Sequence, residues 1–256
     1  MLWDASAING YTIEASDGRI GTVSDLLFED VGWDIRWLVV DTGTWLPGRK
    51  VLLPTTVLGQ PDQVLRQLPV SLTREDVRDS PDIDTDQPVS RQSESLIYDH
   101  YGWDPYWGGS FIPLRNAMAT PFVAPLRLSR MKTPDPEGGD VPHTTQDPHL
   151  RSIAAVTGSD IEASDGEIGH VEDFLVDADG WNVRYLKVET GNWWPGETVL
   201  ISPRSVRGID WTDRLVTLDV DRRTLREAPR YDPSMTVDGA YEATFQTYYG
   251  IWWTAA

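Results

Sequence analysis

The chain has 256 residues, with 40% hydrophobic side chains and 12 Trp, which excludes a disordered chain and allows two folded domains. Its net charge of −18 at pH 7 opposes binding to nucleic-acid phosphates or to an anionic lipid surface. The absence of Cys excludes disulfides, thiolate metal ligands and Cys nucleophiles.

The N-terminal residues predict no targeting segment. They lack the basic region and apolar stretch of a secretory signal, so we expect a cytoplasmic protein. The apolar runs are short, as at residues 37–40, whereas a membrane-spanning helix needs about 20 residues. We therefore expect no membrane insertion.

Short strands and tight turns follow one another from residue 12 onward. Asp17-Gly18 suits a turn with positive φ, and residues 35–40 form a β-branched and aromatic run. Pro47-Gly48 makes the next turn, before an apolar run at 51–53, and residues 64–68 are expected to form another strand. This spacing of turns predicts a small closed β-barrel, which would also remove exposed sheet edges.

A short tail follows the strands. Thr73 with Asp76 three residues later predicts a capped helical turn. The aromatic residues 93–101 come next and are expected to be helical or extended over the barrel. Residues 132–149 are rich in Pro, Gly and Thr, which is typical of a linker.

The whole pattern then repeats with an offset of 148 residues. Residues 13–53 match residues 161–201 without a gap, and 23 of these 41 positions are identical. The register continues to Gly102 and Gly250. We therefore expect a tandem duplication, with a first barrel and aromatic tail at 1–125, a linker at 126–152, and a second barrel and aromatic tail at 153–256.

Three segments of the first copy carry a family pattern. Residues 18–25 read Gly-x-Ile-Gly-x-Val-x-Asp, residues 33–43 read WDIRWLVVDTG, and residues 45–54 read WLPGRKVLLP. Together they resemble the PRC-barrel domain, which is named for the cytoplasmic part of the photosynthetic reaction centre H subunit. The resemblance implies a barrel used for docking, with no catalytic residues to transfer.

The predicted fold class is all-β, with two small closed PRC-type β-barrels in tandem, each with a short helical or aromatic tail. We expect a non-catalytic, acidic binding or assembly module that docks a protein partner or associates with itself, including as a homo-oligomer. The alternative is a barrel that binds a small ligand or a metal ion. We expect no cofactor, no nucleic-acid partner and no enzymatic activity.

Aromatic side chains are the first candidates for partner binding. Trp45 and Trp193 lie in the shared segment Thr-Gly-x-Trp-x-Pro-Gly, where they either plug a barrel end or act as exposed anchors. Trp252 and Trp253 belong to a terminal aromatic cluster that must pack on its own barrel or on another subunit.

Charged positions that differ between the copies are the second candidates. The aligned pairs are Arg19 with Glu167, Arg49 with Glu197, and Lys50 with Thr198. Such differences could let a positive rim on one copy meet a negative rim on the other, within one chain or between chains. Independent drift of solvated turn residues is the competing interpretation.

Catalytic and metal motifs are weak. The four His residues occupy no matching positions in the two copies, so no duplicated base is available to activate a nucleophile. Asp82-x-Asp84-x-Asp86 superficially resembles a calcium loop but is followed by Gln-Pro instead of Gly, so a solvated acidic turn is favoured over a cation site.

Overall fold

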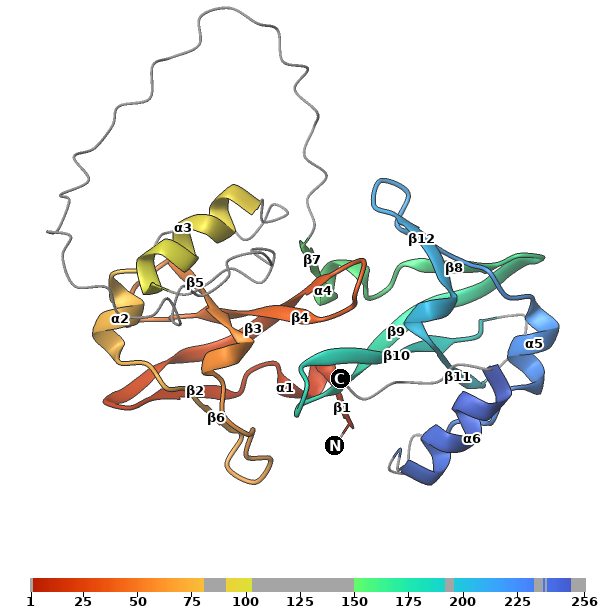
Figure 1. Ribbon diagram of the computed structural model, residues 1–256, viewed down its shortest axis with the longest axis horizontal. Coiled ribbons are helices and arrows are strands. Elements are labelled where there is room, and N and C mark those ends of the chain that lie inside the picture. The colour runs from red at the N-terminus through yellow and green to blue at the C-terminus, as the bar shows by residue number, and fades with distance from the viewer. Residues whose placement is uncertain are drawn as a thin grey trace, which may run out of the picture.

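The computed structural model describes residues 2–80, 91–102, 150–191, 196–232, 237 and 239–249. They form two sheets that lie side by side, with short helices at their outer faces and ends (Figure 1). No helix in these ranges is long and apolar enough to cross a membrane.

The first sheet is built mainly from the first copy, in the order β5-β4-β3-β2-β6. Its strands are β2 (Thr12–Ala15), β3 (Gly18–Glu29), β4 (Ile35–Asp41), β5 (Lys50–Pro54) and β6 (Gln67–Pro69). The pair β2–β6 is parallel and the others are antiparallel. The remaining elements are η1 (Thr55–Val57), α2 (Arg74–Arg78) and α3 (Arg91–Tyr101).

The second copy repeats this plan in the order β11-β10-β9-β8-β13-β12. Its strands are β8 (Asp160–Ala163), β9 (Gly166–Asp177), β10 (Asn182–Glu189), β11 (Thr198–Ile201), β12 (Val206–Asp210) and β13 (Leu215–Leu218). The remaining elements are η3 (Pro203–Ser205), α5 (Arg222–Glu227) and α6 (Gly239–Tyr249). In both copies the predicted tail contains a helix.

Neither sheet closes into a barrel, which corrects the expectation of two closed barrels. In the first copy, the 3-10 turn η1 interrupts the ladder after β5. The chain then meets the far edge of the sheet through isolated bridges, Leu58 with Val70 and Asp62 with Gln67, and the backbone hydrogen bonds beside them, instead of through a strand ladder. The backbone groups of a 3-10 turn hydrogen-bond to residues three positions along the chain, as the Leu58 amide does to the Thr55 carbonyl, so they do not continue a strand ladder.

The two copies exchange their N-terminal strands, each of which pairs with the sheet of the other copy. β1 (Leu2–Asp4) pairs with β9 of the second copy, and β7 (Leu150–Ser152) pairs with β3 of the first. Each is followed by a one-turn helix, α1 (Ala5–Ile8) or α4 (Ile153–Val156), between the sheets (Figure 1). β7 falls within the range 126–152 that the sequence predicted as a linker.

One hydrophobic core runs through both copies. The Phe28 and Phe174 rings lie 6.0 Å apart, between centroids, where the sheets meet. Trp33 and Trp181 are each 7% exposed, so the repeat places them in equivalent environments. Two smaller clusters form under the tail helices, around Ile97 of α3 and Phe245 of α6.

Candidate functional site

The tips of the β3–β4 and β9–β10 hairpins join directly. The Ile35 amide donates to the Trp181 carbonyl at 2.7 Å, and the Val183 amide donates to the Trp33 carbonyl at 2.8 Å. Asp34 and Asn182 form an isolated bridge between them. The backbones of the two copies are therefore linked reciprocally at this point.

Both tips need an unusual backbone conformation. Trp33 has φ +62° and Trp181 has φ +49°, in the left-handed region that a bulky side chain rarely adopts. Burial of both rings offsets this strain, and the Trp33 ring stacks on Phe28 at 5.0 Å. The hairpin tips are thus held in place by the core that they help to form.

Two carboxylates anchor the exchanged segments. Asp25 of β3 accepts hydrogen bonds from the Ser152 hydroxyl and, at 3.2 Å, from the Ala154 amide. Asp173 of β9 accepts reciprocally from the hydroxyl and amide of Ser6. Burial raises the pKa of the Asp25 carboxyl, and its hydrogen bonds with Ser152 and the backbone oppose that rise.

A cleft of about 830 Å³ opens beside the joined tips and is lined by both copies. The first copy contributes residues 30–34, including the exposed tip residue Val31. The second copy contributes Asp177, Gly180, residues 182–184, Pro203, Arg204 and Val206. The cleft exists only because the two copies are paired.

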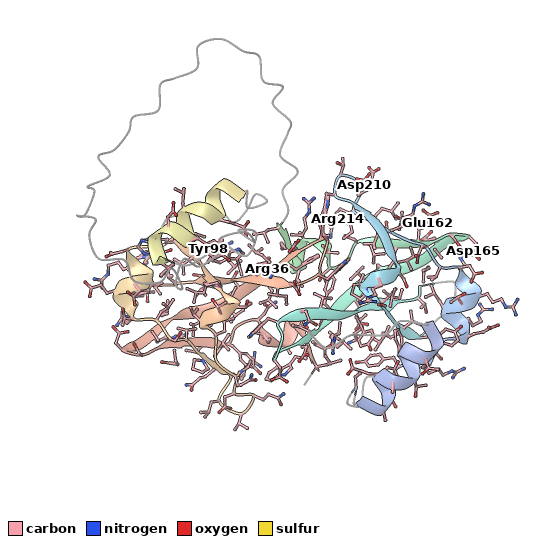
Figure 2. All side chains as sticks on the ribbon, viewed as in Figure 1. Arg36, Tyr98, Glu162, Asp165, Asp210 and Arg214 are labelled. Atoms are coloured by element: carbon pink, nitrogen blue, oxygen red, sulfur yellow. The ribbon has the colours of Figure 1, made fainter. Side chains whose placement is uncertain are left out.

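Most charges around the cleft are engaged with an opposite charge. Asp30 Oδ2 lies 3.0 Å from Arg151 Nε, and Arg36 Nη2 lies 2.8 Å from Glu29 and 2.9 Å from Asp34 (Arg36 is labelled in Figure 2). Burial raises the pKa of the Asp34 carboxyl, an effect that the Arg36 guanidinium opposes. A surface that presents paired charges beside an exposed valine is suited to binding.

The described acidic and histidine side chains do not form a metal-binding cluster. Within the described ranges, no three His, Asp or Glu side chains are placed to hold an ion together. The triplet Asp82, Asp84 and Asp86 lies outside those ranges.

Trp45 has a structural environment. It is partly buried against the core, and the Arg74 guanidinium carbon lies 4.8 Å from its ring centroid. A small cavity of about 250 Å³ lies beside it, lined by Arg19, Thr44 and other residues of the first copy. This environment supports the interpretation of Trp45 as a plug at one end of the sheet, and its role as an anchor stays a prediction.

The predicted charge pairs do not meet within the chain. The β2–β3 and β8–β9 turns, which carry Arg19 and Glu167, lie at opposite ends of the molecule (Figure 1). Figure 2 shows Glu162, the register partner of Glu167, in the hairpin at the outer end of the second copy. Pairing of these charges between chains stays a prediction.

The other predicted pair also makes its contacts inside its own copy. Arg49 donates to the carbonyls of Arg78 and Ser80, and Glu197 lies 4.0 Å from Arg230. Three further candidates lie outside the described residues: Trp193, Trp252 and Trp253.

Sequence reasoning missed the cleft residues Asp30, Val31 and Arg204. One signal was available, because the repeat loses identity at residues 28–31, where Asp30 and Val31 align with Ala178 and Asp179, and regains it at Gly32. Divergence inside a preserved turn indicates that the two tips have different surroundings.

Comparison with known proteins agrees with this architecture. The family model of the PRC-barrel domain matches residues 4–68 and 152–225. A search of curated proteins finds no match. The first matched segment runs from the last residue of β1 into β6, and the second runs from the last residue of β7 through β13 into α5. The chain therefore belongs to the PRC-barrel domain family and carries that domain twice in tandem.

Proposed function

We propose that the chain is a non-catalytic binding and assembly module that docks a protein partner in the cleft between its two copies. The observation that carries this proposal is the composition of the cleft, which takes residues from both copies and so requires the paired arrangement. PRC-barrel domains occur in assembly-type proteins, which supports the same class of function.

The rim of the cleft has the features of a protein-binding surface. Val31 is 79% exposed at the hairpin tip, and Arg204 is exposed on the opposite wall. An exposed apolar residue flanked by charges suits a polypeptide more than an apolar metabolite. Because the whole chain carries −18, the expected partner is a basic segment with an apolar anchor.

Site-specific photocrosslinking in the native cell tests this proposal. A photoreactive residue at position 31 should capture one discrete protein, whereas the same residue at position 64, an exposed valine on another loop, should not. Equal capture at both positions would show that the cleft is not the docking surface.

Charge reversal then tests the opposite wall with the purified partner. Arg204→Glu should raise the affinity by about tenfold, because that side chain lines the cleft and the expected partner is basic. Arg207→Glu is the matched control, since Arg207 is also exposed on the neighbouring strand and does not line the cleft. An equal effect of the two substitutions would contradict the proposed site.

A small ligand is the second candidate occupant, favoured by volume alone. The cleft of about 830 Å³ lies within the range of small-molecule sites, about 300–1,000 Å³. A metabolite that raises the thermal unfolding midpoint of the wild type but not of Arg204→Glu would favour this function. We also propose that the chain associates with itself, and light scattering over a range of protein concentrations measures this association.

A further inference from the structure

The two exchange contacts occupy equivalent positions in the repeat but differ in chemistry. Trp3 of β1 lies opposite Val176 of β9, and Arg151 of β7 lies opposite Phe28 of β3. Residues 3 and 151 are one repeat offset apart. Both are buried, with Trp3 8% and Arg151 6% exposed, so one buried position holds an aromatic ring and its equivalent holds a charge.

Arg151 is accommodated by residues from both copies. Its Nε lies 3.0 Å from Asp30 Oδ2 of the first copy. Its guanidinium carbon lies 4.1 Å from the ring centroid of Trp211 of the second copy. A guanidinium this deeply buried is tolerated only with such an opposite charge and polarisable face. The ion pair therefore joins the two copies.

The equivalent contact has no charge. Trp3 packs on Tyr11 with ring centroids 6.4 Å apart in an edge arrangement. Ala178, which is 2% exposed, stands in the repeat where the other contact has Asp30. Both partners have therefore changed together, to arginine with aspartate on one side and to tryptophan with alanine on the other.

We infer that these coupled differences make the interface between the copies selective, so that the first copy pairs with the second and not with another copy of itself. In a pair of first copies, Trp3 would face the Asp30 carboxylate without a guanidinium. In a pair of second copies, Arg151 would face Ala178 without a carboxylate. The first mismatch sets the partly exposed Asp30 carboxylate against an aromatic ring, and the second leaves the buried Arg151 guanidinium without that carboxylate, so both disfavour the wrong pairing.

This inference goes beyond the proposed function, because it concerns which half each half accepts. Within the chain, it assigns the contact between the copies to residues other than the charge pairs expected from the sequence, whose pairing between chains stays a prediction. It also explains why the cleft lined by Asp30 has two unlike walls, since the residue that pairs with Arg151 also lines the cleft.

Coupling between the paired positions is measured first, in the full chain, by urea unfolding followed by far-UV circular dichroism. Asp30→Ala removes the carboxylate beside the buried Arg151 guanidinium, and we expect the folding equilibrium constant to fall on the order of tenfold to a hundredfold. Adding Arg151→Met should recover most of that loss. Ala178→Asp should likewise destabilise, and adding Trp3→Arg should recover stability. Double variants that lose as much as the two singles combined would overturn the inference.

Selectivity itself is measured by disulfide capture, because the natural chain has no Cys. Leu2 faces Asp177 across the native contact, and Glu29 is the repeat equivalent of Asp177. Leu2→Cys with Glu29→Cys should therefore give disulfide-linked dimers only when first copies of two chains pair. Leu2→Cys with Asp177→Cys, which joins native neighbours, is the intrachain control.

The capture is carried out after refolding at high protein concentration in two backgrounds. The native contacts should yield monomers, whereas Asp30→Ala with Arg151→Met, which makes both contacts uncharged, should yield at least about fivefold more linked dimer. Equal dimer yields in the two backgrounds would overturn the inference. Neither measurement requires a partner in the cleft, so the proposed function can fail without affecting this result.

Discussion

Glu94, in the first turn of helix α3, has a completely buried carboxylate. It accepts a hydrogen bond from Trp37 Nε1 at 2.8 Å, which fixes the helix to the outer face of the first sheet. The second copy keeps the carboxylate as Glu242, 3.7 Å from Arg184, over Tyr185 in place of Trp37. Burial, followed by the charge of Glu94, raises the pKa of the adjacent Tyr98 to about 12. A carboxylate at this position therefore holds the tail helix on its sheet in both copies.

Removing the carboxylate should loosen α3. We expect Glu94→Ala to lower the free energy of unfolding by about 2 kcal/mol, because the buried Trp37 N–H loses its acceptor. Glu94→Gln keeps an acceptor oxygen and should lose less. Asp99→Ala, at an exposed position of the same helix, is the control. Chemical unfolding gives the values, and equal losses for Glu94→Ala and Asp99→Ala would contradict this role.

The sequence contained part of this information. Glu94 and Glu242 align within tails that keep few other residues, such as Gly102 with Gly250, so the shared carboxylate was visible in the repeat. It could not indicate the partner, because Trp37 lies 57 residues away and a β-strand pattern alone does not say which helix covers it. Tertiary packing supplied the missing contact.

At the scale of elements, helices α2 and α5 show how local signals specify local structure. Thr73 and Asp76 form the predicted capping box on α2, and Asp221 caps α5 through the Thr224 amide. The turn residues Asp17 and Asp165 accept from the first amides of the same helices. Each helix is thus tied to the hairpin beside it.

The capping box gives a pH signature. Hydrogen bonds from Thr73 lower the pKa of Asp76 below its ordinary value of 3.8 in the folded protein. The contribution of Asp76 to the free energy of unfolding is therefore complete above pH 3.8 and is lost as the pH falls through the lower pKa of the folded state. We expect Asp76→Ala to cost about 0.5 kcal/mol at pH 7, since the site is exposed, and less at pH 2.

Thermal unfolding across this pH range, with Glu75→Ala as the control on the same helix, provides the measurement. Glu75 is exposed and precedes Asp76 directly. A loss of stability caused by Asp76→Ala that grows as the pH falls would contradict the lowered pKa of Asp76.

The element pattern was predictable where periodicity was long and unpredictable where it was short. Turn dipeptides and apolar alternation indicated the hairpins around β3 and β9. The exchanged strands β1 and β7 have three residues each, too few for a pattern. The closed barrel was inferred from turn spacing, which does not reveal that a 3-10 turn breaks the ladder. The cleft was unpredictable because it depends on which copies pair.

At the scale of the whole molecule, the exchange makes the two copies interdependent. The shared core includes residues from both sheets, from β1 and α1, and from α4. Asp25 and Asp173 each hold a segment of the other copy. A sheet that separated from its partner would expose Phe28 or Phe174 and lose a strand. Neither half has an independent core at the point where they meet.

The duplicated chain should therefore unfold in one cooperative transition, although a tandem repeat of separate domains would give two. We expect a single calorimetric peak with equal calorimetric and van't Hoff enthalpies. Phe28→Ala and Phe174→Ala lie in different copies, yet each should move that one peak downward. Loss of a buried phenyl ring is worth about 3–5 kcal/mol, which corresponds to about 10 °C for a protein of this size. Val64→Ala, at an exposed loop position, should leave the peak in place. Two peaks, each moved by only one of the phenylalanine substitutions, would show that the copies fold independently and that the contacts between them are secondary.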